Sequence, residues 1–369
     1  MIHTRAPRHR LFAAVAAMTA CFWFRGVPQD LNLVDYGSME GFFVNDQMVV
    51  NLRRNVVFKY DDVTVRADHA RWWRSDKTVK FSDNVRVTRV AQTLTCRYLH
   101  FEGREKMLYA RNNVVFADTV EMIRVTGRTA RYDLERSHCI LEGEPAFFRF
   151  DTAAAETLSI VGKRMMYDDS LKKTSVVDSV KVTKGLLTAR CMEGYYFSAD
   201  DLAQLRTDPE IFYGEHKLTG DSVDLYFSED TLNGVSVAGN SYGLYIDPEE
   251  AETTWTRIWG DSMYMSLNDS GFLDSVWVHG NVLSKYSSAE DTIEANEVSG
   301  KTMIVDFGEK SAIRHALVWG NAECIYYVED KSANDRNEAS GDTLAAWFAD
   351  GRAVRLKLLG DIRGNYFPE

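Results

Sequence analysis

The decapeptide LTGDSVDLYF, at Leu218–Phe227, alternates apolar and polar residues as a half-buried strand does. Variants of this decapeptide recur along the chain. Related stretches are VRADHARWWR (65–74), VTGRTARYDL (125–134), IWGDSMYMSL (258–267), VSGKTMIVDF (298–307) and ASGDTLAAWF (339–348). A phrase that recurs along the whole chain predicts a tandem-repeat protein.

A second short motif, such as NVVF at Asn55 or NVRV at Asn84, precedes each copy of the decapeptide and defines where each repeat starts. The starts are Asn55, Asn84, Asn113, Pro145, Ser179, Pro209, Asn240, Asn281, Asn321 and Asp361, at intervals of 29 to 41 residues. The variable part of the later units holds acidic segments such as DPEEAETT and SSAEDTIEA, which are typical of surface loops. About ten repeats of packed strands are therefore predicted.

Positions +1 and +3 after each start form an apolar stripe, while residues between them, such as Arg86, Lys181 and Glu323, are expected to face water. A single unit exposes its stripe, and stacking hides it. The stripe residues expected to line an apolar furrow are Phe58, Val85, Val87, Val114, Phe116, Phe148, Val180, Val182 and Phe212. In the last units the stripe residues become smaller, so the furrow is expected either to narrow or to be filled by Trp277 and Trp319.

Composition supports an all-β fold. The chain of 369 residues has 17 Tyr, 19 Phe and 8 Trp, and no long stripe of helical period appears. The net charge of −11 argues against a nucleic-acid partner. Charge is also uneven along the chain: residues 51–190 carry 26 Lys+Arg against 18 Asp+Glu, and residues 201–369 carry 13 against 30.

The first 24 residues form a separate segment. Arg5, Arg8 and Arg10 precede the apolar run LFAAVAAMTACFWF, which is shorter than the ~20 apolar residues of a membrane-spanning helix. This pattern predicts a signal peptide or a short membrane or lipid anchor, with Cys21 as the candidate lipidation site because MTAC resembles a lipobox. Residues 25–54 then lead into the first rung, and residues 55–369 hold the repeats. The remaining cysteines, Cys96, Cys139, Cys191 and Cys324, are widely spaced and are interpreted as buried single thiols, with three disulfide pairings left open.

Strands that start with NV, second strands of the form [LVI]-[TS]-[AG]-[DKR] and G-N or G-D steps between units resemble the OstA-like proteins, relatives of the periplasmic lipopolysaccharide-transport bridge protein. The resemblance spans about residues 40–369. It implies an elongated open β-jellyroll, a folded-over, solenoid-like sheet whose V-shaped interior is an apolar trough.

The resemblance also implies a function. Such a protein is a non-enzymatic lipid carrier or bridge in lipopolysaccharide transport and outer-membrane assembly, located in the periplasm of a Gram-negative-type bacterium. Its partners would be lipopolysaccharide or a related glycolipid and other transport β-jellyrolls, joined by edge-strand pairing, with head-to-tail self-association as a further expectation. No cofactor is expected.

Enzyme motifs are missing from the sequence. It contains no G-x-S-x-G, no H-E-x-x-H and no P-loop, so neither catalytic nor metal-binding residues are predicted. Two alternatives remain: a right-handed parallel β-helix that binds or processes a polysaccharide, and a structural scaffold of the cell envelope in which the stripe is simply filled core.

Overall fold

The computed structural model describes residues 31–60, 62–120, 122–151, 156–168, 170–197, 199–228, 231–247, 254–268, 272–287, 295–330, 333–349 and 352–367. Within these ranges the chain forms 26 β-strands and one short 3-10 helix, η2 (Glu309–Ser311), which confirms the predicted all-β class. No helix in the described part of the chain has the length and hydropathy needed to cross a bilayer. The candidate signal segment and Cys21 lie outside the described residues.

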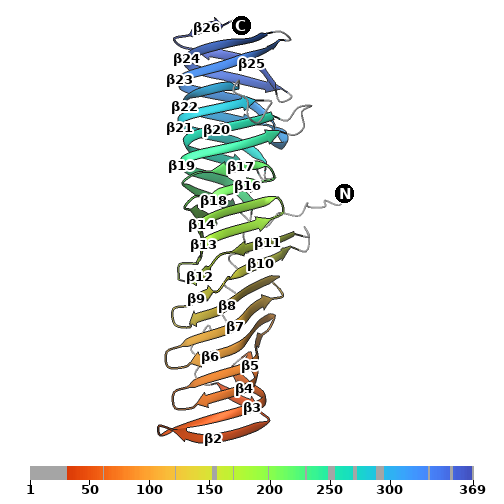
Figure 1. Cartoon of the computed structure of the whole chain (residues 1–369), viewed down its shortest axis with the longest axis vertical. Helices are drawn as coiled ribbons and strands as arrows, with labels where there is room; N and C mark the ends of the chain where they lie inside the picture. The colour runs from red at the N-terminus through yellow and green to blue at the C-terminus, as the bar shows by residue number, and fades with distance from the viewer. Residues whose placement is uncertain are drawn as a thin grey trace. The chain divides into compact units, whose positions relative to one another are not determined.

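Contacts between residues divide the chain into two compact units. Unit one comprises Met1–Gly185 and Met192–Asp201. Its strands, which follow one another as antiparallel rungs from red to green in Figure 1, are β1 (Asn32–Asp35), β2 (Ser38–Val44), β3 (Gln47–Tyr60), β4 (Val63–Trp73), β5 (Thr78–Arg89), β6 (Gln92–Glu102), β7 (Met107–Asp118), β8 (Ile123–Asp133), β9 (His138–Glu142), β10 (Ala146–Asp151), β11 (Glu156–Val161), β12 (Arg164–Asp168) and β13 (Lys173–Lys184).

Unit two comprises Leu186–Cys191 and Leu202–Glu369, and β14 (Leu187–Phe197) contributes residues to both units. Its other strands are β15 (Leu202–Arg206), β16 (Glu210–Tyr213), β17 (His216–Thr219), β18 (Ser222–Ser228), β19 (Thr231–Asp247), β20 (Thr254–Leu267), β21 (Leu273–Ser287), β22 (Asn296–Phe307), β23 (Ile313–Asp330), β24 (Ala333–Ala349), β25 (Arg352–Leu359) and β26 (Arg363–Phe367).

Each repeat turns a corner at two consecutive residues with positive φ. The corners are Arg54/Asn55, Asp83/Asn84, Asn112/Asn113, Gly143/Glu144, Asp178/Ser179, Thr207/Asp208, Gly239/Asn240, Gly280/Asn281, Gly320/Asn321 and Gly360/Asp361. Asn, Asp and Gly tolerate this left-handed conformation better than other residues, which explains why eight of these ten corners end in Asn or Asp. At β3, β5 and β7 the strand pairing skips these residues as a bulge and then continues in register.

The corners fold the sheet of unit one into two walls. The A wall comprises segments 56–60, 63–67, 85–89, 92–96, 114–118, 123–127, 146–151, 156–161 and 180–184, and the B wall the parts of β3–β13 on the other side of each corner. Side chains of the two walls meet across the interior: the ring of Phe58 lies 5.5 Å from that of Trp72 and 5.3 Å from that of Phe81, both edge-on. The sheet of unit one is thus folded over, and the inner faces of its two walls pack against each other.

Two of the predicted starts are one residue late. The left-handed pairs place the starts at Glu144 and Asp208 instead of Pro145 and Pro209, because the proline ring fixes φ near −65° and cannot adopt the corner conformation. The other eight starts coincide with the second residue of a corner.

The pairing excludes one predicted alternative. All strand pairs given for the described residues, from β1–β3 to β24–β26, are antiparallel, whereas a parallel β-helix requires parallel neighbours. A second expectation is also wrong: Trp277 is 47% exposed and alternates with buried Val276 and Val278, so it points away from the interior. Trp319, which follows buried Val318, has the same outward phase.

Candidate functional site

The A wall of unit one carries a continuous apolar row on its inner face. Strand register places its members directly beside one another: Phe58, Val65, Val87, Leu94, Phe116, Val125, Phe147, Ile160 and Val182. All but Leu94 are buried, and Phe58 and Phe147 are 0% exposed. We call this the middle row. It crosses the strands, so each rung contributes one side chain to it.

A second row lies beside the corners and is made of smaller side chains. Its buried members are Val56, Ala67, Val85, Cys96, Val114 and Val180. Together the corner row and the middle row contain seven of the nine residues predicted for the furrow, namely Phe58, Val85, Val87, Val114, Phe116, Val180 and Val182, and all seven are buried.

Phe148 and Phe212 lie on the other face, because the starts at Glu144 and Asp208 shift the alternation by one residue. Phe148 is half-buried and pairs with exposed Arg124, while its neighbour Phe147 occupies the middle row. Phe212 is half-buried, and the Lys217 ammonium lies 5.3 Å from its ring. Ile211, not Phe212, pairs with Ala189 and Leu218, which are both buried.

A third row, at the free margin of the A wall, combines charged and polar residues with two buried aliphatic ones. In register order it runs Arg89, Gln92, Asp118, Ile123, Arg149 and Leu158. Lys184, two residues beyond Val182, continues it on β13. The inner face is therefore amphipathic: it is apolar near the corners and carries charged side chains at the margin.

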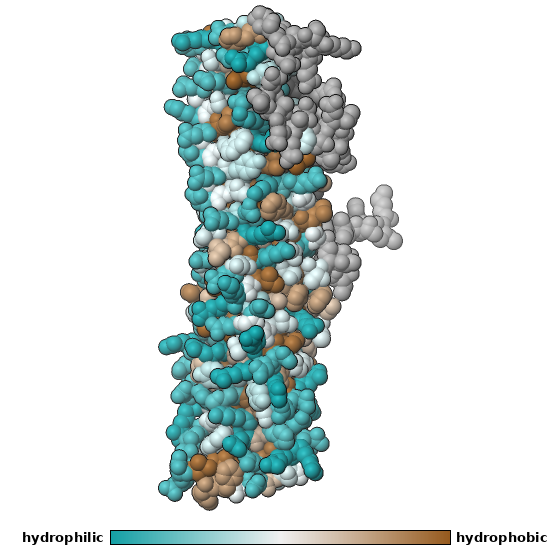
Figure 2. Space-filling view, in the orientation of Figure 1, coloured by the Kyte–Doolittle hydropathy of each residue, from teal (hydrophilic) through white to brown (hydrophobic). Residues whose placement is uncertain are grey.

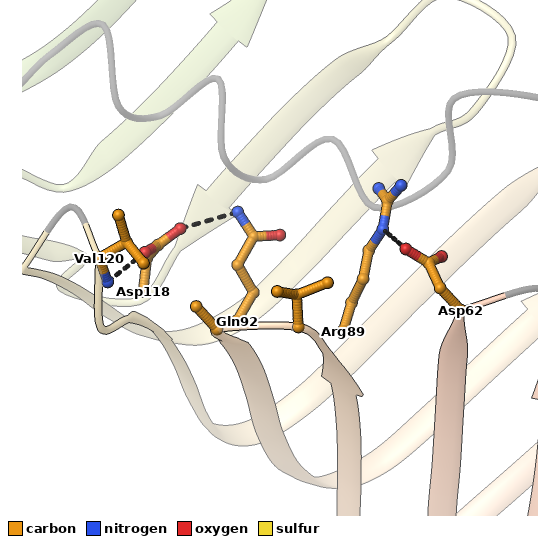
Figure 3. Close-up of a pocket in the computed structure, with 7 residues that line it drawn as sticks. Asp62, Arg89, Gln92, Asp118 and Val120 are labelled. Carbon is orange, nitrogen blue, oxygen red and sulfur yellow. Dashed lines mark hydrogen bonds and ion pairs between the residues drawn. The ribbon is translucent and has the colours of Figure 1, made fainter.

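A cavity of about 330 Å³ lies at this margin and is lined by Asp62, Arg89, Val90, Ala91, Gln92, Asp118 and Val120 (Figure 3). Arg89 Nε donates to Asp62 Oδ2 at 2.7 Å. Gln92 Nε2 and the Val120 amide donate to the Asp118 carboxylate at 2.8 and 2.9 Å. Each charged group that lines the cavity thus has a hydrogen-bond partner.

The margin charges were not predicted from the sequence, although a signal exists. With corrected starts, Arg89, Asp118, Arg149 and Lys184 all lie five residues after a corner, in the same inner phase as positions +1 and +3. A charged residue in an otherwise apolar phase marks the edge of the apolar face.

The cysteines that the structure describes are free thiols, and Cys96, Cys139 and Cys191 are buried. Burial raises the pKa of Cys96 to about 12, although its thiol donates to the Tyr98 carbonyl oxygen at 3.2 Å. Burial also raises the pKa of Cys324. Thiols with raised pKa values are poor nucleophiles. Cys96, Cys139 and Cys191 are small apolar core residues, whereas Cys324 is only partly buried. Among the described residues, His, Cys, Asp and Glu do not gather in threes that could hold a metal ion.

The first strands of unit one expose an apolar patch. Met39, Phe43, Val44 and Met48 on β2 and β3 are 47%, 75%, 44% and 45% exposed. Brown hydrophobic atoms gather at the bottom of the view in Figure 2, where Figure 1 places β2. Of the described strands, β2 pairs with β3 through one edge, which leaves its other edge unpaired.

Comparison with known proteins gives one family match: residues 43–137 match the model of the OstA-like protein family. No curated protein matches. Among solved structures, LptH, titled the LptA-homologous periplasmic component of the lipopolysaccharide transport device of Pseudomonas aeruginosa, is 14% identical and covers 29% of this chain and 75% of its own, with a TM-score of 0.26. A TM-score this low does not define a shared architecture.

The matched segment runs from β2 to β8, through three of the corners and the start of both apolar rows. The resemblance expected from the repeats is confirmed there, and residues 43–137 of this chain are an OstA-like segment.

Proposed function

We propose that this chain is a non-enzymatic carrier or bridge for an amphipathic lipid, with lipopolysaccharide as the cargo and assembly of the outer membrane as the process. The observation that carries the proposal is the inner face of unit one, where two apolar rows end in a polar margin. Acyl chains require apolar walls and their headgroup requires a polar one, so this profile matches an amphiphile whose headgroup lies at the margin and whose acyl chains lie toward the corners. The OstA-like segment at 43–137 supports the same assignment.

Entry of a guest requires the two walls to move apart at the margin, because the middle row is closely packed. The contacts across the interior are between side chains, such as those of Phe58 with Trp72 and Phe81. Parting the walls there breaks no strand-to-strand hydrogen bond. The corner residues supply the hinge.

The corrected register defines the test. A photo-crosslinking side chain at Phe116 or Phe147 is expected to capture lipopolysaccharide in cells, and one at Phe148 or Lys181 is not. Phe148 and Phe147 are neighbours in sequence and differ in face, so the pair controls for local exposure to lipid. Equal capture at both would indicate a sticky surface and would contradict the proposal.

The exposed β2 edge and the apolar patch beside it fit a second part of the proposal, strand pairing with other β-jellyrolls of the same transport system. At the other terminus, β26 is exposed along its whole length and includes Tyr366 and Phe367. Pairing through these edges would place the protein in the periplasm, anchored through its N-terminal segment or a lipidated Cys21, or released by signal cleavage.

The second candidate is a structural envelope scaffold in which the rows are permanent core. The full burial of Phe58 and Phe147 favours it, since these rings leave no free space where they lie. Lipid capture at Phe147 separates the two, because a permanently closed core captures none.

A further inference from the structure

Two basic side chains at the margin of the A wall differ from the other charges there. Arg149 and Lys184 lie five residues after the corners at Glu144 and Ser179, in the phase that points to the interior. Both belong to unit one. They were outside the predicted site.

Strand register brings them together. Arg149 pairs with Ile123 and Leu158, which are 2% and 4% exposed. Val182 pairs with Ile160, so Lys184, two residues further on, lies beside Leu158 in the next strand. The Cα atoms of Arg149 and Lys184 are therefore two strand spacings apart, about 10 Å, which two long side chains on one face can close.

These cations lack the partners that the other margin charges have. Lys184 is only 6% exposed. Its Nζ atom and the Nη1 atom of Arg149 are buried and have no hydrogen-bond partner among the described residues. Arg89, in contrast, is paired with Asp62 at 2.7 Å. A buried charge without a partner raises the free energy of the folded protein. A ligand that supplies a counter-charge recovers much of that free energy when it binds.

We propose that Arg149 and Lys184 bind the phosphate group of the lipid cargo. This inference rests on the proposed function, because it assigns the headgroup end of the same site. A phosphate monoester presents several acceptor oxygens and up to two negative charges, so it can engage a planar guanidinium and an ammonium together. The apolar middle row begins two residues away on each strand, at Phe147 and Val182, so the acyl chain follows directly from the phosphate.

The test uses the full chain and two probes with the same acyl chain, a monoacylglycerol and the corresponding lysophosphatidic acid. Wild-type protein is expected to bind the phosphorylated probe at least about tenfold more tightly, the range expected for buried charge-assisted hydrogen bonds. In R149Q/K184Q this preference for the phosphorylated probe is lost. The matched control R124Q/K181Q removes the same charge from the exposed outer face of the same wall and keeps the preference.

A charge-retaining variant and a soluble competitor complete the test. R149K/K184R retains the charge and should retain most of the preference, which covers the case in which the neutral variant misfolds. Inorganic phosphate that competes as well as the phosphorylated lipid would identify a free-anion site and overturn the headgroup assignment.

Failure of the two proposals is distinguishable. Equal binding of both probes to wild-type protein would overturn the phosphate site and leave the carrier function standing. Binding of neither probe would overturn the carrier function and the phosphate site with it.

Discussion

At the scale of single residues, the fold depends on pairs of left-handed residues, and the proposed function depends on which of two neighbouring side chains points inward. Phe147 and Phe148 are chemically identical, yet one is fully buried and the other half-buried. Their difference follows from one corner residue, Glu144, which sets the alternation for the rest of β10. A one-residue error in the start therefore moves a predicted ligand contact to the opposite face.

This gives a matched pair of substitutions. Phe147→Asp buries a carboxylate among Val125 and Ile160 and is expected to lower the free energy of unfolding by several kcal/mol. Phe148→Asp places the same group on the partly solvated face and should cost about 1 kcal/mol or less. Denaturant midpoints of the two variants check the register; similar midpoints would mean that the faces are assigned wrongly.

The corner glycines give a second residue-scale prediction. Gly239 has φ +71°, and an added Cβ would clash with the Asp221 carboxylate, which also accepts from Asn240 Nδ2 at 3.1 Å. Gly239→Ala should lower stability by about 1–2 kcal/mol or more, because a left-handed conformation is strained for alanine. Gly41→Ala is the control, since its added Cβ would meet only the flexible Met48 side chain at 3.3 Å. A thermal melt in which the two variants behave alike would contradict the corner argument.

The buried thiol of Cys96 makes stability depend on pH. Its pKa is about 12 in the fold and 9.0 without the fold, so below pH 9 the thiol is neutral in both states. As pH rises above 9, the unfolded thiol ionises first, and stability falls until about pH 12. At pH 10 the loss from this group is about 1.4 kcal/mol. Urea midpoints at pH 8 and pH 10 should therefore shift less in Cys96→Ala than in wild type; equal shifts would contradict the buried-thiol assignment.

At the scale of elements, period-two alternation was enough to predict strands, repeats and most of the inner stripe. It succeeded at Asn55, Asn84 and Asn113, where the corner residue is itself an asparagine in a visible NV phrase. It fails at the two prolines, because each proline stands out in the sequence but lies one residue after the corner. The margin charges were missed for another reason: each appears once per repeat and varies in sign, and only strand register places them in one row.

The exposed β2 edge belongs to this scale as well. Met39→Lys/Phe43→Lys adds charge to an unpaired edge strand and should weaken any association through it, since charged side chains block edge-to-edge pairing. Its folding should be nearly unaffected, because both side chains are already exposed. Sedimentation of the variant beside wild type measures the effect. Association that survives the change would assign it to another surface.

At the scale of the whole molecule, charge is divided along the chain, with an excess of 8 positive charges in residues 51–190 (26 against 18) and of 17 negative charges in residues 201–369 (13 against 30). Head-to-tail contact between copies would bring unlike charges together and would not close on itself. Such attraction mainly accelerates encounter and is screened by salt.

Truncation before Gly360 tests this arrangement. Removing residues 360–369 deletes β26 and should abolish end-to-end association, while lipid capture at Phe116 persists because that residue lies in unit one. Light scattering at low and high salt measures the first effect, and crosslinking the second. Association that is insensitive to both truncation and salt would remove the head-to-tail model.

The middle row has a further consequence for movement of a cargo. Its side chains lie on successive strands, so a chain sliding along it meets a new contact about every 4.8 Å. Val, Leu, Ile and Phe alternate there without a charged interruption from Phe58 to Val182. Under the proposed carrier function, a lipid would meet a shallow series of similar contacts rather than separate strong binding sites. Its direction of travel would then be set by what loads one end and unloads the other.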